Sequence, residues 1–173
     1  DPSFDLNPEL SRSINYTCFE PIVKLSKDSG IKKFIFASSS SVYGIKSFPN
    51  VTEDSSLEPI TDYSKYKVMC EEILLKNNTK EFSCTIIRPA TVCGFSRRQR
   101  FDLVVNILTN LAYNKKEISV FGGNQLRPNI NIHDMCRSWR KNSSRLFNEL
   151  MHMAALVDGV TISAEEAKPT VGA

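Results

Sequence analysis

Apolar and polar positions in the first 90 residues follow the order helix, strand, helix, strand. The apolar residues between Ile14 and Leu25 roughly keep helical spacing, and Gly30 would end that helix as a C-cap glycine. The run 31–37 is short and rich in β-forming residues, which predicts a strand. Four serines, 38–41, follow it directly. Because ligand crevices in open parallel sheets lie at the carboxyl ends of strands, this serine cluster is a candidate site.

The stretch 45–62 contains prolines and acidic residues without an apolar period, which predicts a loop. Tyr63 opens a second predicted helix, which Asn77 and Asn78 end. Its apolar stripe consists of Val68, Met69, Ile73 and Leu74. Residues 84–87 predict the second strand, which Pro89 stops.

The second half of the chain continues the alternation and then loses its pattern. It predicts a basic loop, a helix at 103–113, a strand at 118–121, a turn at Gly122 and Gly123, and a short strand at 129–132. Such alternation indicates an α/β fold with a parallel sheet. Residues 146–154 suggest an amphipathic helix, and 157–173 show no clear pattern, which predicts a flexible tail.

Composition excludes several classes of protein. With 173 residues, 41% hydrophobic and 24% charged, the chain suits one soluble globular domain with a real core. No apolar run approaches the ~20 residues that cross a bilayer, and no signal segment opens the chain, so we expect a cytoplasmic protein without membrane contact. The net charge of +3 is spread among acidic residues, which argues against nucleic-acid binding.

The cysteines and histidines predict free thiols rather than a metal site. The five cysteines form an odd, scattered set without a C-x-x-C pair, and only two histidines exist to join them. We therefore expect buried free thiols and no bound metal. The cysteines are Cys18, Cys70, Cys84, Cys93 and Cys136.

Tyr63 and Lys67 are the strongest candidates for chemistry. Four residues apart on a helix, they share one face with Cβ atoms about 5–6 Å apart. A nearby ammonium group and the positive end of a helix both favour phenolate, which suits a base that takes a proton from a hydroxyl group. Alone, the spacing is more typical of a solvated helix face, so the evidence lies in its context.

That context is an ordered series of motifs. The segment 38–44 reads S-S-S-S-V-Y-G, and Glu53, Asp54 and Pro59 precede Tyr63 and Lys67. The segment 88–94 reads R-P-A-T-V-C-G, and 120–128 reads V-F-G-G-N-Q-L-R-P. From about residue 1 to 134 the chain resembles the extended short-chain dehydrogenase/reductases, and within them the nucleotide-sugar epimerases of the NAD-dependent epimerase/dehydratase family.

The resemblance implies a role for each matched residue in the first half. Ser39 would hydrogen-bond the reacting sugar oxygen, and Tyr63 would be the base. Lys67 would hold the nicotinamide ribose and lower the pKa of the tyrosine. Ser38 and the backbone of Pro89 would flank the nicotinamide. The implied cofactor is NAD, with NADP left open.

Substrate contacts implied in the second half are Thr91, Val105, Phe121 and Arg127, the last on the diphosphate of a nucleotide sugar. Several of the implied site residues also have an explanation that involves no ligand. The serines could satisfy turn amides, Phe121 could belong to the core, and Arg127 could pair with a surface acid. Thr91 stands where the family often has asparagine.

The chain also departs from the family pattern. The glycine-rich G-x-x-G-x-x-G turn that cradles a pyrophosphate is absent from the sequence. We therefore expect a partial Rossmann-like parallel sheet with flanking helices. Residues 1–92 would be the C-terminal half of the dinucleotide-binding domain, 93–142 part of a small substrate domain, and 143–173 a divergent end. Losing a neighbouring strand would expose an apolar edge at 34–36 and favour self-association.

The predicted function is nucleotide-sugar epimerisation by nicotinamide-mediated oxidation and re-reduction of a sugar carbinol. Family dehydratases carry Asp-Glu where this chain has Ser40 and Ser41, which disfavours dehydration. Two alternatives stay open, a nucleotide-sugar reductase or dehydrogenase and a non-catalytic binding fragment. The resemblance also implies a homodimer through the helix that carries Tyr63.

Overall fold

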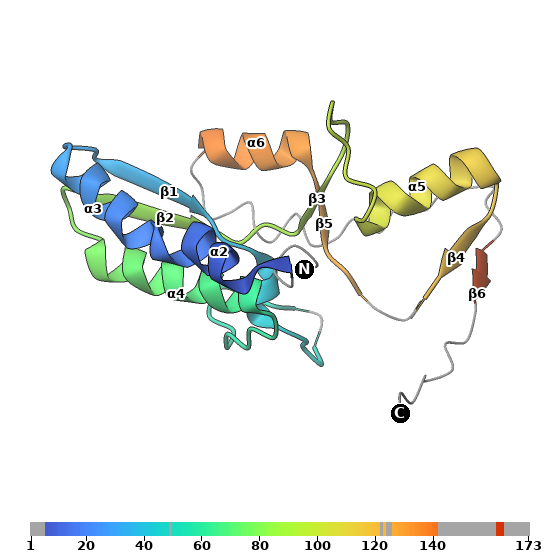
Figure 1. Ribbon diagram of the computed structural model, residues 1–173, viewed down its shortest axis with the longest axis horizontal. Coiled ribbons are helices and arrows are strands. Elements are labelled where there is room, and N and C mark those ends of the chain that lie inside the picture. Colours follow the sequence, from blue (N-terminus) through green and yellow to red (C-terminus); the bar gives the residue numbers. More distant parts are fainter. Residues whose placement is uncertain (1–5, 49, 122, 124–125, 142–161, 165–173) are drawn as a thin grey trace. The chain divides into compact units, whose positions relative to one another are not determined.

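The computed structural model describes residues 6–48, 50–121, 123, 126–141 and 162–164. Helices and parallel strand pairs make up the described chain, which is therefore an α/β protein (Figure 1). It divides into two compact units, Asp1–Ala90 and Thr91–Ala173. The predicted α/β class is confirmed.

The first unit contains helices packed on one parallel strand pair. In chain order its elements are α2 (Pro8–Arg12), a π-helical turn (Ser13–Thr17), α3 (Phe19–Asp28), β1 (Lys33–Ala37), a 3-10 turn (Ser40–Tyr43), α4 (Asp62–Asn77) and β2 (Ser83–Ile87). β1 and β2 pair in parallel, from Lys33 opposite Ser83 to Ala37 opposite Ile87. The connection between the two strands contains α4, as parallel pairing requires a long crossover.

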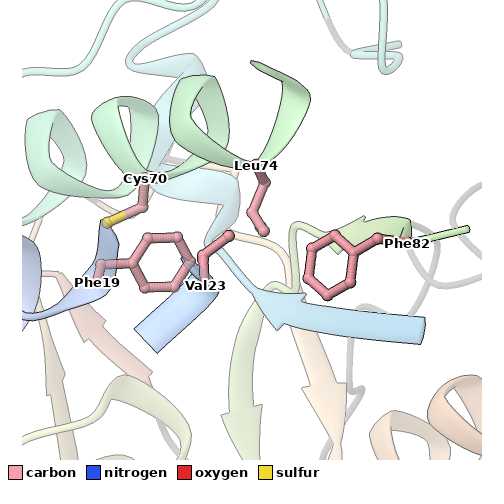
Figure 2. Close-up of a cluster of buried hydrophobic side chains, with 5 residues drawn as sticks. All are labelled: Phe19, Val23, Cys70, Leu74 and Phe82. Carbon is pink, nitrogen blue, oxygen red and sulfur yellow. The ribbon is translucent and has the colours of Figure 1, made fainter. Parts of the chain in front are cut away.

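The core of this unit lies between the two long helices and one face of the strands. Figure 2 shows its buried side chains, which point toward one another: Phe19 and Val23 from α3, Cys70 and Leu74 from α4, and Phe82. Alternate strand residues complete the core, because successive side chains of a strand point to opposite faces. They are Phe34 and Phe36 of β1 and Cys84 and Ile86 of β2.

The π-helical turn interrupts the first helix and is closed by side chains. The Cys18 amide donates to the Ser13 carbonyl, five residues back, which is the π pattern. Asn15 Nδ2 donates to the Ser11 carbonyl at 2.8 Å, and the Cys70 thiol on α4 donates to the Asn15 carbonyl at 3.4 Å. Polar and thiol side chains thus bond carbonyls around the wider turn.

The second unit consists of short elements. They are β3 (Thr91–Cys93), α5 (Val104–Lys115), β4 (Ile118–Val120), β5 (Asn129–Asn131), α6 (Ile132–Lys141) and β6 (Ile162–Ala164). β3 pairs in parallel with β5, and β4 pairs in parallel with β6. The strand β6 lies in the stretch for which the sequence predicts no pattern.

Most predicted elements of the described chain are present, with shifted ends. The predicted first helix is longer and is broken by the π turn, and Gly30 follows its end with a positive φ of 75°. Three of its apolar residues are exposed rather than buried, namely Ile14, Ile22 and Leu25. The elements α2, β3, α6 and β6 were not predicted. Gly122 and the predicted helix at 146–154 lie outside the described residues.

The five thiols are free, but their burial differs from the prediction. Only Cys70 is buried, while Cys18 and Cys136 are exposed. Among the residues that the structure describes, no three potential ligands of the Asp, Glu, His or Cys types gather at one point. No helix in the described part combines the length and the apolar character needed to cross a membrane.

The core gives a direct stability test. Phe82 is 1% exposed, and Phe82→Ala should lower the free energy of unfolding by about 3–5 kcal/mol, because lost burial adds to the cost of a cavity. Leu75 is 65% exposed, and Leu75→Ala should change it by less than about 0.5 kcal/mol. Urea unfolding followed by circular dichroism measures both, and equal losses would contradict this core.

Candidate active site

The serine segment turns sharply where β1 ends. The Ser38 amide donates to the Ile87 carbonyl at 2.7 Å, and the Ser40 amide donates to the Pro89 carbonyl at 2.9 Å. These bonds extend the β1–β2 pairing past both strands. The backbone of Pro89 is therefore fixed beside the serines by the sheet itself.

Ser39 begins the 3-10 turn and accepts hydrogen bonds from a neighbour. Its Oγ accepts from the Ser41 amide at 3.2 Å and from the Ser41 hydroxyl at 2.9 Å. A serine hydroxyl has two acceptor sites and one donor. With both acceptor sites used by Ser41, the Ser39 proton is left to donate to a ligand oxygen. Ser41 therefore both satisfies the turn and orients Ser39.

Ser38 carries a buried hydroxyl group that no other described residue bonds. Its residue is 3% exposed, and among the described residues its Oγ has no hydrogen-bond partner. Leaving a buried hydroxyl unpaired costs about 1–3 kcal/mol. A bound polar group would remove that cost, which fits the place where the nicotinamide end of a dinucleotide is expected.

The helix α4 starts with a reciprocal cap that fixes the position of Tyr63. The Ser64 amide donates to Thr61 Oγ1 at 3.2 Å, and the Thr61 amide donates to Ser64 Oγ at 3.0 Å. This capping box sets the first turn of the helix. Tyr63 is the second residue of α4 and lies in the field of its positive end.

Lys67 links α4 to the end of β1. Its Nζ donates to the Ala37 carbonyl at 2.8 Å and lies 5.5 Å from the centroid of the Tyr63 ring. It also lies 4.7 Å from the centroid of the Phe36 ring. Desolvation by burial lowers the pKa of Lys67, and the negative charge of Glu71 opposes this shift. The structure therefore brings Tyr63 and Lys67 together beside the residue that precedes the serines.

Glu71, for which the motifs predict no role, forms a buried charge pair with Arg88. Glu71 is 2% exposed, and its carboxylate accepts from Arg88 Nη2 at 2.6 Å and from Nε at 3.0 Å. Burial alone would lower the pKa of Arg88, but its hydrogen bonds to Glu71 and Tyr43 raise it instead. A detectable signal existed, because Glu71 follows Lys67 by four residues and so lies on the face of α4 that carries Tyr63.

Apart from Ser39, the predicted substrate residues lie in the second unit. Thr91 opens β3, and its amide donates to the Pro128 carbonyl at 3.3 Å, so β3 lies next to the segment that contains Arg127. The side chain of Arg127 is exposed. Val105 is half-buried in the first turn of α5. Phe121 is 68% exposed, so it is not a core residue of the described chain.

The arrangement of the first unit is that of the short-chain dehydrogenase/reductases: parallel strands, a serine turn at their carboxyl end, and a helix with tyrosine and lysine one turn apart. The chain belongs to the NAD dependent epimerase/dehydratase family, whose model matches residues 6–141. The predicted family is confirmed, and with it membership of a family of enzymes.

Relatives of the chain include several sugar 4-epimerases. The N-acetyl-alpha-D-glucosaminyl-diphospho-ditrans,octacis-undecaprenol 4-epimerase of Escherichia coli is 33% identical over 115 residues, which are 64% of this chain and 34% of that protein. The UDP-glucose 4-epimerase of Bacillus subtilis is 29% identical over 137 residues, which are 69% of this chain and 40% of that protein.

A solved structure extends the likeness to the fold. The UDP-glucuronic acid 4-epimerase of Bacillus cereus, in complex with NAD, matches with a TM-score of 0.63 and 28% identity, over 74% of this chain and 42% of that one. Its match supports the Rossmann-like fold. The chain spans less than half the length of each of these three relatives.

Gly44, at the end of the serine turn, gives a prediction about the site's backbone. It has φ 69° and ψ −146°, and a Cβ there would meet the carbonyl oxygen of Glu58. Gly30 also has a positive φ, of 75°, but open space around it. Gly44→Ala should therefore cost more than about 3 kcal/mol, and Gly30→Ala about 1–2 kcal/mol. Thermal unfolding distinguishes them, and equal losses would refute the close approach.

Lys67 gives a prediction about pH. Because its pKa is lower in the folded state, the unfolded chain binds more protons between that pKa and 10.5, so stability rises with pH across this window. Lys67→Met should abolish this part of the rise, measured as the free energy of unfolding from about pH 8 to about pH 10. Lys65→Met is the control, because Lys65 is exposed and pairs with Asp62. An identical pH profile for parent and Lys67→Met would contradict the burial of this ammonium group.

Proposed function

We propose that the protein containing this chain is an NAD-dependent nucleotide-sugar epimerase, and that this chain supplies Ser39, Tyr63 and Lys67 to its reaction. The observation that carries the proposal is the position of Lys67. Its ammonium group, bonded to the Ala37 carbonyl, lies 5.5 Å from the Tyr63 ring at the end of β1. A structural relative in complex with NAD and relatives named as sugar 4-epimerases support the same function.

The residues present fit the nicotinamide end of the cofactor. The buried Ser38 hydroxyl lacks a partner among the described residues, and Lys67 offers further N–H donors beside it. Ser38, Lys67 and the backbone of Pro89 would hold the nicotinamide and its ribose. When bound, NAD supplies a hydride acceptor that later returns the hydride to the sugar carbon.

The chain's own residues would handle the proton of the reacting hydroxyl. Ser39, whose acceptor sites are taken by Ser41, would donate to the carbinol oxygen and orient it. Tyr63 would remove the hydroxyl proton as the carbon is oxidised and return it on reduction. The ammonium group of Lys67 and the start of α4 both favour the phenolate form that this role needs. Epimerisation then requires the oxidised sugar to present its opposite face to the nicotinamide before the hydride returns.

Contacts to the sugar and diphosphate would come from the second unit. We assign these roles to Thr91, Val105, Phe121 and Arg127. The exposed Arg127 is suited to a diphosphate, because a guanidinium fork binds two oxyanion oxygens at once. The exposed Phe121 has apolar surface available for a sugar ring.

The 3-10 turn gives a reason to favour epimerisation over dehydration. Dehydration needs an acid and a base beside the sugar, but this chain has hydroxyl groups at 40 and 41. The hydroxyl of Ser41 is already bonded to Ser39. A serine hydroxyl is not among the side chains that act as general acid or base near neutral pH.

Tyr63→Phe tests the proposed function. With NAD and UDP-glucose, the chain should form UDP-galactose, detected by proton NMR. The variant should lose about 10²–10⁴-fold in rate, because it lacks the base, while calorimetry shows unchanged NAD binding. Tyr66→Phe is the control, since this tyrosine lies on the same helix with its ring stacked on Tyr16. Full activity of Tyr63→Phe would remove the mechanism, and absence of both binding and turnover in the parent chain would favour a non-catalytic fragment.

A further inference from the structure

Arg88 joins α4 to the far end of the serine turn. Besides its fork to Glu71, its Nη1 donates to the Tyr43 hydroxyl at 2.8 Å and to the Glu53 carbonyl at 3.2 Å. Its guanidinium carbon lies 5.0 Å from the centroid of the Tyr43 ring. Tyr43 is itself buried and ends the 3-10 turn. One side chain therefore holds a helix, a turn and a loop.

The helix holds the serine segment at both of its ends. Tyr63, Lys67 and Glu71 follow one another at four-residue spacing and form one stripe on α4. Lys67 bonds the Ala37 carbonyl, just before the serines, and Glu71 reaches Tyr43, just after them, through Arg88. The segment between these two attachments contains the serines of the site.

The backbone adds a third connection. Arg88 is followed by Pro89, whose carbonyl accepts from the Ser40 amide at 2.9 Å. A change in the position of Arg88 therefore moves the acceptor that holds Ser40. Since the guanidinium group is planar and its donors are fixed relative to one another, it transmits position better than a flexible ammonium group would.

We infer that Arg88, held by its hydrogen bonds to Glu71 and Tyr43, is a positioning residue that sets the distance between the Ser39 hydroxyl and the Tyr63 phenol. This inference rests on the proposed function, because it assigns those two groups to one reacting carbinol. Arg88 commits its Nε, Nη1 and Nη2 atoms to Glu71, the Tyr43 hydroxyl and the Glu53 carbonyl. Its effect is on alignment, where a displacement of about 1 Å can cost about 10²-fold in rate.

Tyr43→Phe tests the contact between Arg88 and the serine turn with the smallest change, since it removes only the hydroxyl group that Arg88 bonds. Amide hydrogen exchange should accelerate by about 10-fold or more at Ser40 and Val42, because one charge-assisted bond that closes the turn is lost. The amides of α3, such as Ile22, should keep their exchange rates. Phe82→Leu is the matched control, which should accelerate exchange in the core of the first unit and not selectively in the turn.

A second readout separates positioning from general stability. Tyr43→Phe and Arg88→Lys should each lower kcat by about 10²-fold and leave KM for the nucleotide sugar unchanged, because alignment and not binding is lost. Tyr113→Phe, on an exposed tyrosine of α5, should leave both constants unchanged. Local acceleration of exchange together with a fall in kcat supports the inference.

Two results would overturn it. Exchange that is unchanged or uniformly faster in Tyr43→Phe would show that Arg88 does not hold the turn. Local acceleration with an unchanged kcat would show that the turn's position does not govern the reaction. If Tyr63→Phe contradicts the proposed chemistry, the exchange measurement on Tyr43→Phe still reports whether Arg88 holds the turn. Failure of the proposed function and failure of this inference are therefore distinguishable.

Discussion

A carboxylate and a guanidinium group meet with little exposure to water where α4 passes the end of β2. The side chains of Glu71 and Arg88 are 2% and 15% exposed, so water screens the carboxylate hardly at all and the guanidinium group only in part. Removing one partner of such a pair typically costs about 3–5 kcal/mol, because the other charge stays buried and unpaired. The helix, the second strand and the serine turn are therefore bound to each other by one electrostatic constraint, and the site residues lie on the segments that it joins.

Strong local patterns made much of the first unit predictable. The run of β-forming residues at β1 and the capped, striped helix α4 follow rules that act within a few residues. The π turn was not predictable, because its carbonyls are bonded by Asn15 from the same helix and Cys70 from another. The three-residue strand β3 is too short to show a period, and its pairing with β5 is a tertiary property.

The site divides in the same way. The four-residue spacing of Tyr63 and Lys67 predicted that they share one face of the helix. The serines at the end of the first strand predicted the other part of the site. The role of Glu71 depends on Arg88, 17 residues further on, and no local rule connects the two. Nor could the sequence indicate that Ser41 occupies the acceptor sites of Ser39, since four adjacent serines look equivalent until the 3-10 turn distinguishes them.

The π-helical turn has a consequence for the length of the first helix. Ser11 and Phe19 are both buried, yet eight residues would place them about 80° apart on a regular α-helix. The wider turn takes up that difference. Deleting one residue there would leave seven residues from Ser11 to Phe19, which a regular α-helix places within about 20° of each other, so both would still face the core. The π turn therefore accommodates one extra residue while Ser11 and Phe19 both stay buried. Homologous sequences that lack this residue should keep the same packing with a regular α-helix.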